Sequence, residues 1–154
     1  MADGDAPRPS GVEADLTVVV GVDASDVARA ALVWAARYAE LVGGRVEVVH
    51  AWHPHETYVW MPDLPPPVPP TDVARKALQD LVDDVVGDRP VPVTAEVVEG
   101  HAGRVLVDRS RSADLLVVGS RGHGGFDGLA LGSVSGHCAE HARCSVLIVR
   151  PPVG

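Results

Sequence analysis

Residues 114–135 read Asp114-Leu-Leu-Val-Val-Gly-Ser-Arg-Gly-His-Gly-Gly-Phe-Asp-Gly-Leu-Ala-Leu-Gly-Ser-Val-Ser135, and this stretch decides the fold. Its apolar run 115–118 is typical of a strand buried on both faces. A glycine-rich segment follows, and a short helix is predicted at 133–142. Glycines allow close backbone approach to a ligand, and a helix start offers unpaired N–H groups at its positive dipole end. This order of strand, glycine segment and helix start predicts a phosphate site.

The rest of the chain alternates predicted strands and helices. Apolar, β-branched segments predict strands at 16–22, 45–52, 91–98, 114–119 and 145–150. Apolar residues at helical spacing predict helices at 24–42, from a cap at Thr71 to about 85, at 102–111 and at 133–142. Asp23 is a candidate cap of the first helix, and Gly43-Gly44 ends it. Continuous apolar strands that alternate with helices predict an α/β fold, with a five-stranded parallel sheet and helices on both faces.

The strand order follows from where the unusual residues fall. In open parallel sheets a ligand sits at the carboxyl ends of the strands, where the strand order reverses. Special residues follow two strands here, at 21–23 after the first and from Gly119 onward after the fourth. If both groups line one site, the first and fourth strands are neighbours, which predicts the order 3-2-1-4-5. The fifth strand then lies at an edge, and its lack of charge before Arg150 favours pairing with a second chain.

Length and composition narrow the class of protein. The 154 residues, 46% of them hydrophobic, suit one domain, predicted at 15–152. We expect a disordered polar tail at 1–14 and a Pro-rich loop at 53–70. A net charge of −8 without a long basic run argues against nucleic-acid and polybasic membrane binding. The sequence shows no signal-peptide core, no run of membrane-spanning length and only two cysteines, which predicts a cytoplasmic protein.

The glycine segment has a specific spacing. Gly119, Gly122, Gly132 and Ser133 match the pattern Gly-x2-Gly-x9-Gly-Ser. The segment is no P-loop, because no Gly-Lys-Ser/Thr follows, and no Rossmann fingerprint, because it comes after the fourth strand. The pattern resembles the ATP-binding subgroup of the universal stress protein family. The similarity extends to 20–25, 48–52, 113–122 and 141–150, and covers about residues 15–151.

The resemblance implies a fold like that of the adenine nucleotide alpha hydrolases and a role for each matching residue. Gly21, Val22 and Asp23 would border adenine and ribose, and the backbone of Ala51 would close over adenine. The ribose and phosphates would be wrapped by Gly119, Ser120, Arg121, Gly122, His123, Gly124 and Gly125. The phosphates would be held by amides and hydroxyls of Gly132, Ser133, Val134 and Ser135. The implied cofactor is ATP with Mg²⁺, with ADP or AMP left open, and Asp127 could face solvent, assist Mg²⁺ or weaken triphosphate binding.

The implied function is a nucleotide-dependent stress-response switch with at most slow ATP hydrolysis, and a homodimer formed through 145–150. Two other classes stay open: a hydrolase or nucleotidyl-transfer enzyme on this scaffold, and an interaction module that binds no nucleotide. The glycine segment offers only His123 and Asp127 as general bases, so no catalytic residue is assigned. His137, Cys138, His141 and Cys144 have the composition of a zinc set. Because His137 and Cys138 are adjacent, they point about 100° apart on a helix, and no metal site is predicted.

Overall fold

A computed structural model of the protein describes residues 15–53, 72–122 and 130–151. The strands are β1 (Thr17–Gly21), β2 (Arg45–Trp52), β3 (Val93–Glu99), β4 (Leu115–Gly119) and β5 (Ser145–Val149). The helices are α1 (Asp26–Val42), α3 (Asp72–Val86), α4 (Ala102–Ser110) and α5 (Ser133–His141). The predicted tail, the Pro-rich stretch from 54 onward and the Thr71 cap lie outside the described residues.

The five strands form one parallel sheet in the order β3-β2-β1-β4-β5, which confirms the predicted order. β1 lies at its centre, where Val18 pairs with Val46 of β2 and with Leu115 of β4. Val18, Val19 and Val20 are fully buried, as their continuous apolar sequence predicted. β3 and β5 are the two edges of the sheet.

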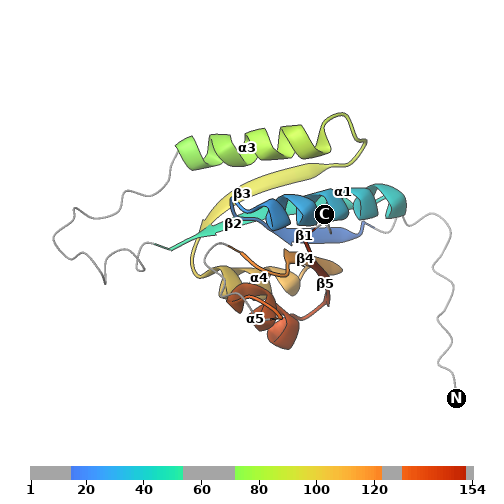
Figure 1. Ribbon diagram of the computed structural model, residues 1–154. Helices are drawn as coiled ribbons and strands as arrows, with labels where there is room; N and C mark the ends of the chain where they lie inside the picture. The colour runs from blue at the N-terminus through green and yellow to red at the C-terminus, as the bar shows by residue number, and fades with distance from the viewer. Residues whose placement is uncertain (1–14, 54–71, 123–129, 152–154) are drawn as a thin grey trace, which may run out of the picture.

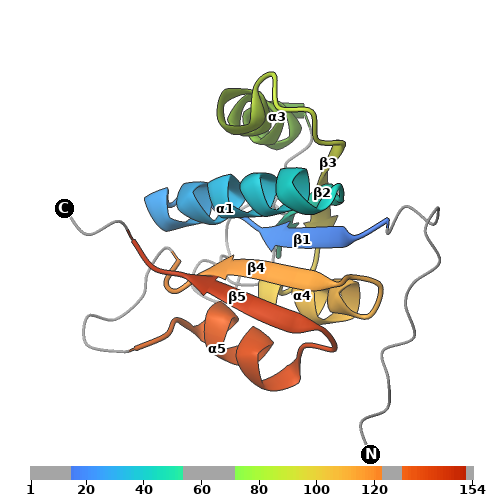
Figure 2. The ribbon, with the colours of Figure 1, turned by 90° about the vertical axis from the view of Figure 1, so that its right-hand side faces the viewer.

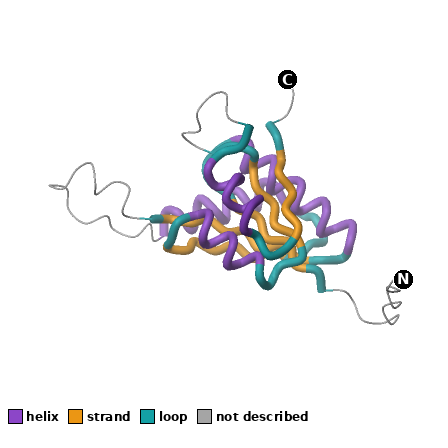
Figure 3. The backbone as a smooth tube through the Cα atoms, turned by 90° about the horizontal axis from the view of Figure 1, so that it is seen from below, coloured by secondary structure: helices purple, strands orange, loops and turns teal. Residues whose placement is uncertain are grey.

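Helices cover both faces of the sheet. α1 and α3 lie on one face, and α4 and α5 lie on the other (Figures 1 and 2). Alternate residues of β1 face the two helix layers. Val18 and Val20 belong to the core cluster that includes residues of α1 and α3, whereas Val19 belongs to the cluster that includes residues of α4 and α5. Seen from below, the strands run side by side against the helices (Figure 3).

The start of α1 differs from the sequence prediction. Ser25 is its N-cap, and the hydroxyl of Ser25 accepts a hydrogen bond from the N–H of Ala28 at 3.2 Å. Asp23 instead binds the capping residue, so its role as the cap was predicted wrongly. The end of α1 was predicted correctly, because Gly43 closes it in the left-handed conformation with φ at 69°.

The start of β3 and the cap of α5 differ from prediction, although α5 starts at Ser133 as predicted. β3 begins at Val93 rather than 91, since Pro92 has no N–H and offers only its carbonyl, which accepts from Val46 N at 2.9 Å. α5 begins after Gly132 as its N-cap, so Ser133 is the first helical residue rather than the cap. Trp34 of α1 is large and apolar, yet 55% of its surface is exposed. In the described part of the chain no helix is long and apolar enough to cross a membrane.

Candidate functional site

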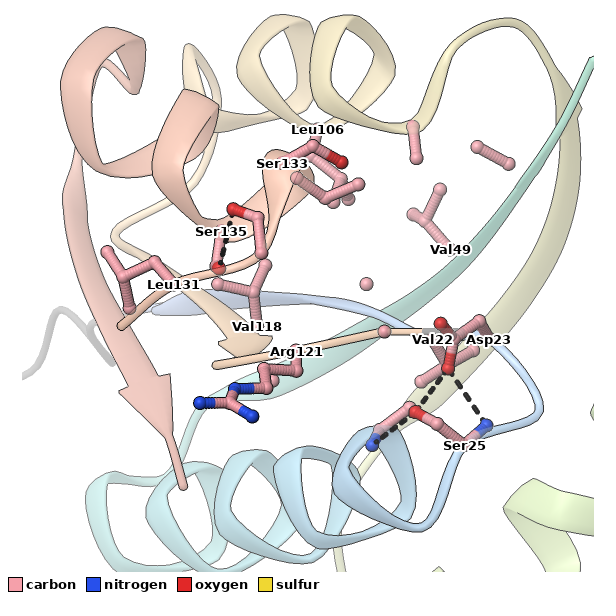
Figure 4. A pocket seen from close by; sticks show the side chains of 18 residues that line it. Val22, Asp23, Ser25, Val49, Leu106, Val118, Arg121, Leu131, Ser133 and Ser135 are labelled. Carbon is pink, nitrogen blue, oxygen red and sulfur yellow. Dashed lines mark hydrogen bonds between the residues drawn. The ribbon is translucent and has the colours of Figure 1, made fainter. Parts of the chain in front are cut away.

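A cavity of about 470 Å³ opens at the carboxyl ends of β1 and β4 (Figure 4). This is where the sheet reverses its strand order, because β2 follows β1 on one side and β4 lies on the other. Its described walls are formed by Gly21, Val22, Asp23, Ser25, Ala28, Val49, Ala51, Ala102, Leu106, Val118, Gly119, Arg121, Gly122, Leu131, Gly132, Ser133, Val134 and Ser135. The volume lies within the range of small-molecule sites, which is about 300–1,000 Å³.

Hydrogen bonds fix the turn that follows β1. The N–H of Val22 donates to the carbonyl of Val49 at 3.0 Å, and Nδ1 of His50 lies 2.9 Å from the carbonyl of Val22. Oδ1 of Asp23 accepts from the N–H of Ser25 at 2.9 Å and also from the Ser25 hydroxyl (Figure 4). The Asp23 carboxylate is therefore anchored to the start of α1, and its position in the wall is defined before any ligand arrives.

Three wall glycines stand where a side chain would collide. A Cβ at Gly21 would lie 2.5 Å from Leu106 Cδ1, and one at Gly119 would lie 2.7 Å from Val27 Cγ1. At Gly122 a Cβ would lie 2.6 Å from Oδ2 of Asp23. Positive φ angles occur among the described glycines at Gly43, Gly87 and Gly100 (not at these three positions). Close approach, rather than an unusual backbone conformation, explains these wall glycines.

The first turn of α5 supplies the polar wall. The amides of Ser133, Val134 and Ser135 begin the helix and have no partner within it, whereas Gly136 N already donates to Gly132 O at 2.9 Å. Ser133 is exposed, so its hydroxyl and amide can meet a ligand. Such a helix start attracts anions through its N–H groups and its dipole.

Ser135 lines the cavity, but its hydroxyl is bonded within the protein. Its hydroxyl is buried and donates to the carbonyl of Ser120 at 2.8 Å, so its one proton is committed inside the protein. That same carbonyl accepts from Gly132 N at 2.7 Å, and Ser120 N donates to Val149 O at 2.8 Å. Ser120 itself is buried behind the wall rather than part of it. Ser120 and the Ser135 hydroxyl therefore position α5.

The two ends of the cavity differ in character. Val22, Val49 and Asp23 lie at one end, and Leu131 and Ser135 lie at the other, with Arg121 below (Figure 4). The first end is mostly apolar, with Ala51 and Ala102 beside Val49 in the wall. Asp23 and Arg121 carry the formal charges of the described wall, one negative and one positive. The arrangement suits a ligand with a flat apolar body and an anionic group.

Most of the residues predicted for the site come together at this cavity. Of those that the structure describes, all line the cavity except Ser120. His123, Gly124, Gly125 and Asp127 lie outside the described residues. The sequence analysis missed Ser25, Ala28, Val49, Ala102, Leu106, Val118 and Leu131. Leu106 and Ala102 come from α4 and have apolar side chains typical of helix packing, so only the crossover topology could have indicated them.

The sequence from 16 to 150 matches the family model described as the universal stress protein family. The chain belongs to this family. The universal stress protein Rv2623 of Mycobacterium tuberculosis is 38% identical over 144 residues, which cover 87% of this chain and 47% of that protein. This universal stress protein chain thus spans about half the length of the curated relatives it matches.

Solved structures show the same fold. A universal stress protein solved in complex with cAMP has a TM-score of 0.65 and 27% identity, and the match covers 88% of this chain and 96% of that chain. The protein from Archaeoglobus fulgidus in complex with dAMP has a TM-score of 0.64 and 22% identity, with 87% and 97% covered. At that identity the second similarity concerns the fold alone.

Proposed function

We propose that the cavity binds an adenine nucleotide, with the base at the apolar end and the phosphates at α5. The observation that carries the proposal is the start of α5, where exposed Ser133 and three amides without a partner in the helix lie in the wall of the cavity. Asp23, anchored by Ser25, stands beside Val22 and Val49, where its carboxylate can accept hydrogen bonds from ribose hydroxyls. The related protein with bound cAMP supports an adenine ligand.

The proposed ligand is ATP, with ADP and AMP as the alternatives. Amides and the Ser133 hydroxyl can neutralise phosphate oxygens locally, which a protein of net charge −8 requires. Arg121 adds a positive charge in the wall. Mg²⁺ would accompany the triphosphate, and phosphate and water oxygens would supply most of its ligands. Asp23 is the carboxylate of the described wall, and its oxygen chemistry fits such a hard cation.

The proposed work is a nucleotide-dependent switch in a stress response, with at most slow hydrolysis. The described wall holds no histidine, and its one carboxylate, Asp23, already accepts two hydrogen bonds from Ser25. The same proposal includes a homodimer formed through the edge strand β5. It also includes a cytoplasmic location, where Cys138 and Cys144 stay free thiols. A hydrolase or nucleotidyl-transfer enzyme, or a module that binds no nucleotide, are the competing functions.

Two measurements test the proposal. Mass spectrometry of denatured purified protein should detect co-purified adenine nucleotide, and calorimetry with ATP, ADP, AMP and adenosine should rank the ligands. Failure of all four to bind would leave the non-nucleotide module. Steady-state phosphate release should be slow compared with common enzymes, whose turnover is about 1–1,000 per second. Release in that range would favour the hydrolase.

A further inference from the structure

An apolar stripe runs along the exposed flank of α1. Trp34, Tyr38 and Leu41 follow each other at spacings of four and three residues, which places them on one face of the helix. Their exposed fractions are 55%, 39% and 83%. α1 already buries its core face through six other residues, so the stripe is additional to the face that packs on the sheet. Large apolar side chains grouped in this way mark an interaction surface.

The stripe points away from α3. Arg29 pairs with Asp84 of α3, and Glu40 pairs with Arg89 just after it, so these two residues mark the α3 side of α1. With about 100° per residue, the stripe lies about 140° around the helix from that side. α3 covers β3, whereas α1 covers β1 and β4 and reaches β5. The stripe therefore faces the side of the molecule where β5 ends the sheet, and Figure 2 shows how α1 and β5 are arranged there.

The edge beside the stripe is open and uncharged. β5 pairs with β4 on one side, and no residue from Ser145 to Val149 carries a charge. Leu147 is partly exposed and packs into the core layer beneath α1. Because α1 reaches β5, the stripe and the edge strand lie on the same side of the molecule.

We propose that this stripe meets the same stripe of a second copy of the chain, which pairs with the first through β5. The inference rests on the β5 pairing of the proposed function and adds the contact that completes it. Antiparallel pairing of β5 with itself requires a twofold axis perpendicular to the sheet. Such an axis keeps each α1 on the same face, so the two exposed flanks of α1 face each other across the new edge.

The size of the side chains fits this geometry. Strands lie about 4.8 Å apart, so the two β4 strands would stand about 14 Å and the two β1 strands about 24 Å from each other. Helices in direct contact lie about 8–10 Å apart, and two α1 helices above these strands cannot approach so closely. Only large side chains can fill the groove between them, and α1 places Trp34 at its middle with Tyr38 next along. A five-residue strand pair alone falls short of the roughly 1,200 Å² that stable interfaces bury, so the stripe supplies needed area.

The test compares dimer dissociation for variants of the two parts of the surface. The double variant Trp34→Glu/Tyr38→Glu should raise the dimer dissociation constant about 30-fold or more, as loss of an interface hot spot does. Val73→Glu is the matched control, because Val73 is a similarly exposed apolar residue (84%) on α3, and it should change the constant less than about twofold. Sedimentation or light scattering over a dilution series gives the constants, and both variants should still bind ATP.

The outcomes separate the two proposals. Should the double variant stay dimeric while Val146→Arg in β5 makes monomers, the stripe is not part of the interface and edge pairing stands. A wild type that is monomeric at every concentration removes both ideas and leaves nucleotide binding untouched. If the double variant fails to fold, Trp34→Cys in a Cys144→Ser background replaces it, since a short bis-maleimide should then cross-link two copies. If Trp34→Cys cross-links no more than Val73→Cys does, the proposal is overturned.

Discussion

Gly122 offers the sharpest test of the site, because its nearest neighbour is known. A Cβ added by Gly122→Ala would lie 2.6 Å from Oδ2 of Asp23, below the 3.0 Å that real Cβ atoms keep. The carboxylate would have to move, but Oδ1 is held by the N–H and the hydroxyl of Ser25. We therefore expect the substitution to displace Asp23 from the ribose position or to keep the ligand out.

The expected magnitude follows from the hydrogen bonds that are lost. A hydrogen bond to a charged group contributes about 1.5–3 kcal/mol, so losing one at Asp23 should weaken ATP binding by about ten- to a hundredfold. Gly122→Val, with a larger branched side chain, should abolish binding. Isothermal titration calorimetry gives the affinities, and the thermal shift with ATP should shrink in parallel.

Gly136→Ala is the matched control. Gly136 lies in α5 with nothing within 4 Å of an added Cβ, so the same substitution should leave ATP affinity unchanged and stabilise the helix by up to about 1 kcal/mol. A double-mutant cycle makes the test strict. In an Asp23→Ala background Gly122→Ala should cost little further affinity. An equal loss with and without the Asp23 carboxylate would refute the reasoning.

Three further predictions follow from the remaining contacts. Ser133→Ala should weaken ATP binding while adenosine binding stays nearly constant in calorimetry, whereas Ser135→Ala should instead lower the urea-unfolding free energy by about 1 kcal/mol, because its hydroxyl is bonded internally. Val146→Arg should convert a β5-paired dimer to monomers in light scattering, since it places a charge on an apolar edge. Burial, with a smaller effect from the Cys144 thiol, raises the pKa of Cys138 to about 11. Cys144 should therefore react first with a thiol reagent at pH 8, and the contribution of Cys138 to stability should be lost as the pH rises from about 9 to 11.

The parts of the fold that were predictable are those in which one local pattern has one structural solution. An uninterrupted run such as 18–20 needs cover on both faces, and this implies a central parallel strand. The glycine spacing from Gly119 to Ser133 predicted where the cavity lies, because strand end, glycines and helix start are adjacent in sequence. That adjacency accounts for the prediction of seven of the eighteen described wall residues, which all lie between Gly119 and Ser135.

The parts that were missed depend on which way a side chain turns. Ser133 and Ser135 look equivalent in sequence, yet two residues on a helix differ by about 200°, and only Ser133 is exposed. Leu106 reaches the cavity from α4 through packing against Gly21, which no local pattern records. The large apolar side chain of Trp34 suggests burial, but α1 uses alanines for most of its buried face and leaves Trp34 exposed.

Ser120 has a consequence for how the two proposed activities communicate. Its carbonyl holds the first turn of α5 through Gly132, while its N–H holds the last residue of β5, Val149. A single residue thus joins the start of α5, at one end of the cavity, to the edge strand of the sheet. If nucleotide binding and self-association each shift this residue, they must influence one another equally in free energy, whichever occurs first. We therefore expect ATP affinity to depend on protein concentration, so that measuring it over a dilution series of the protein reports this coupling.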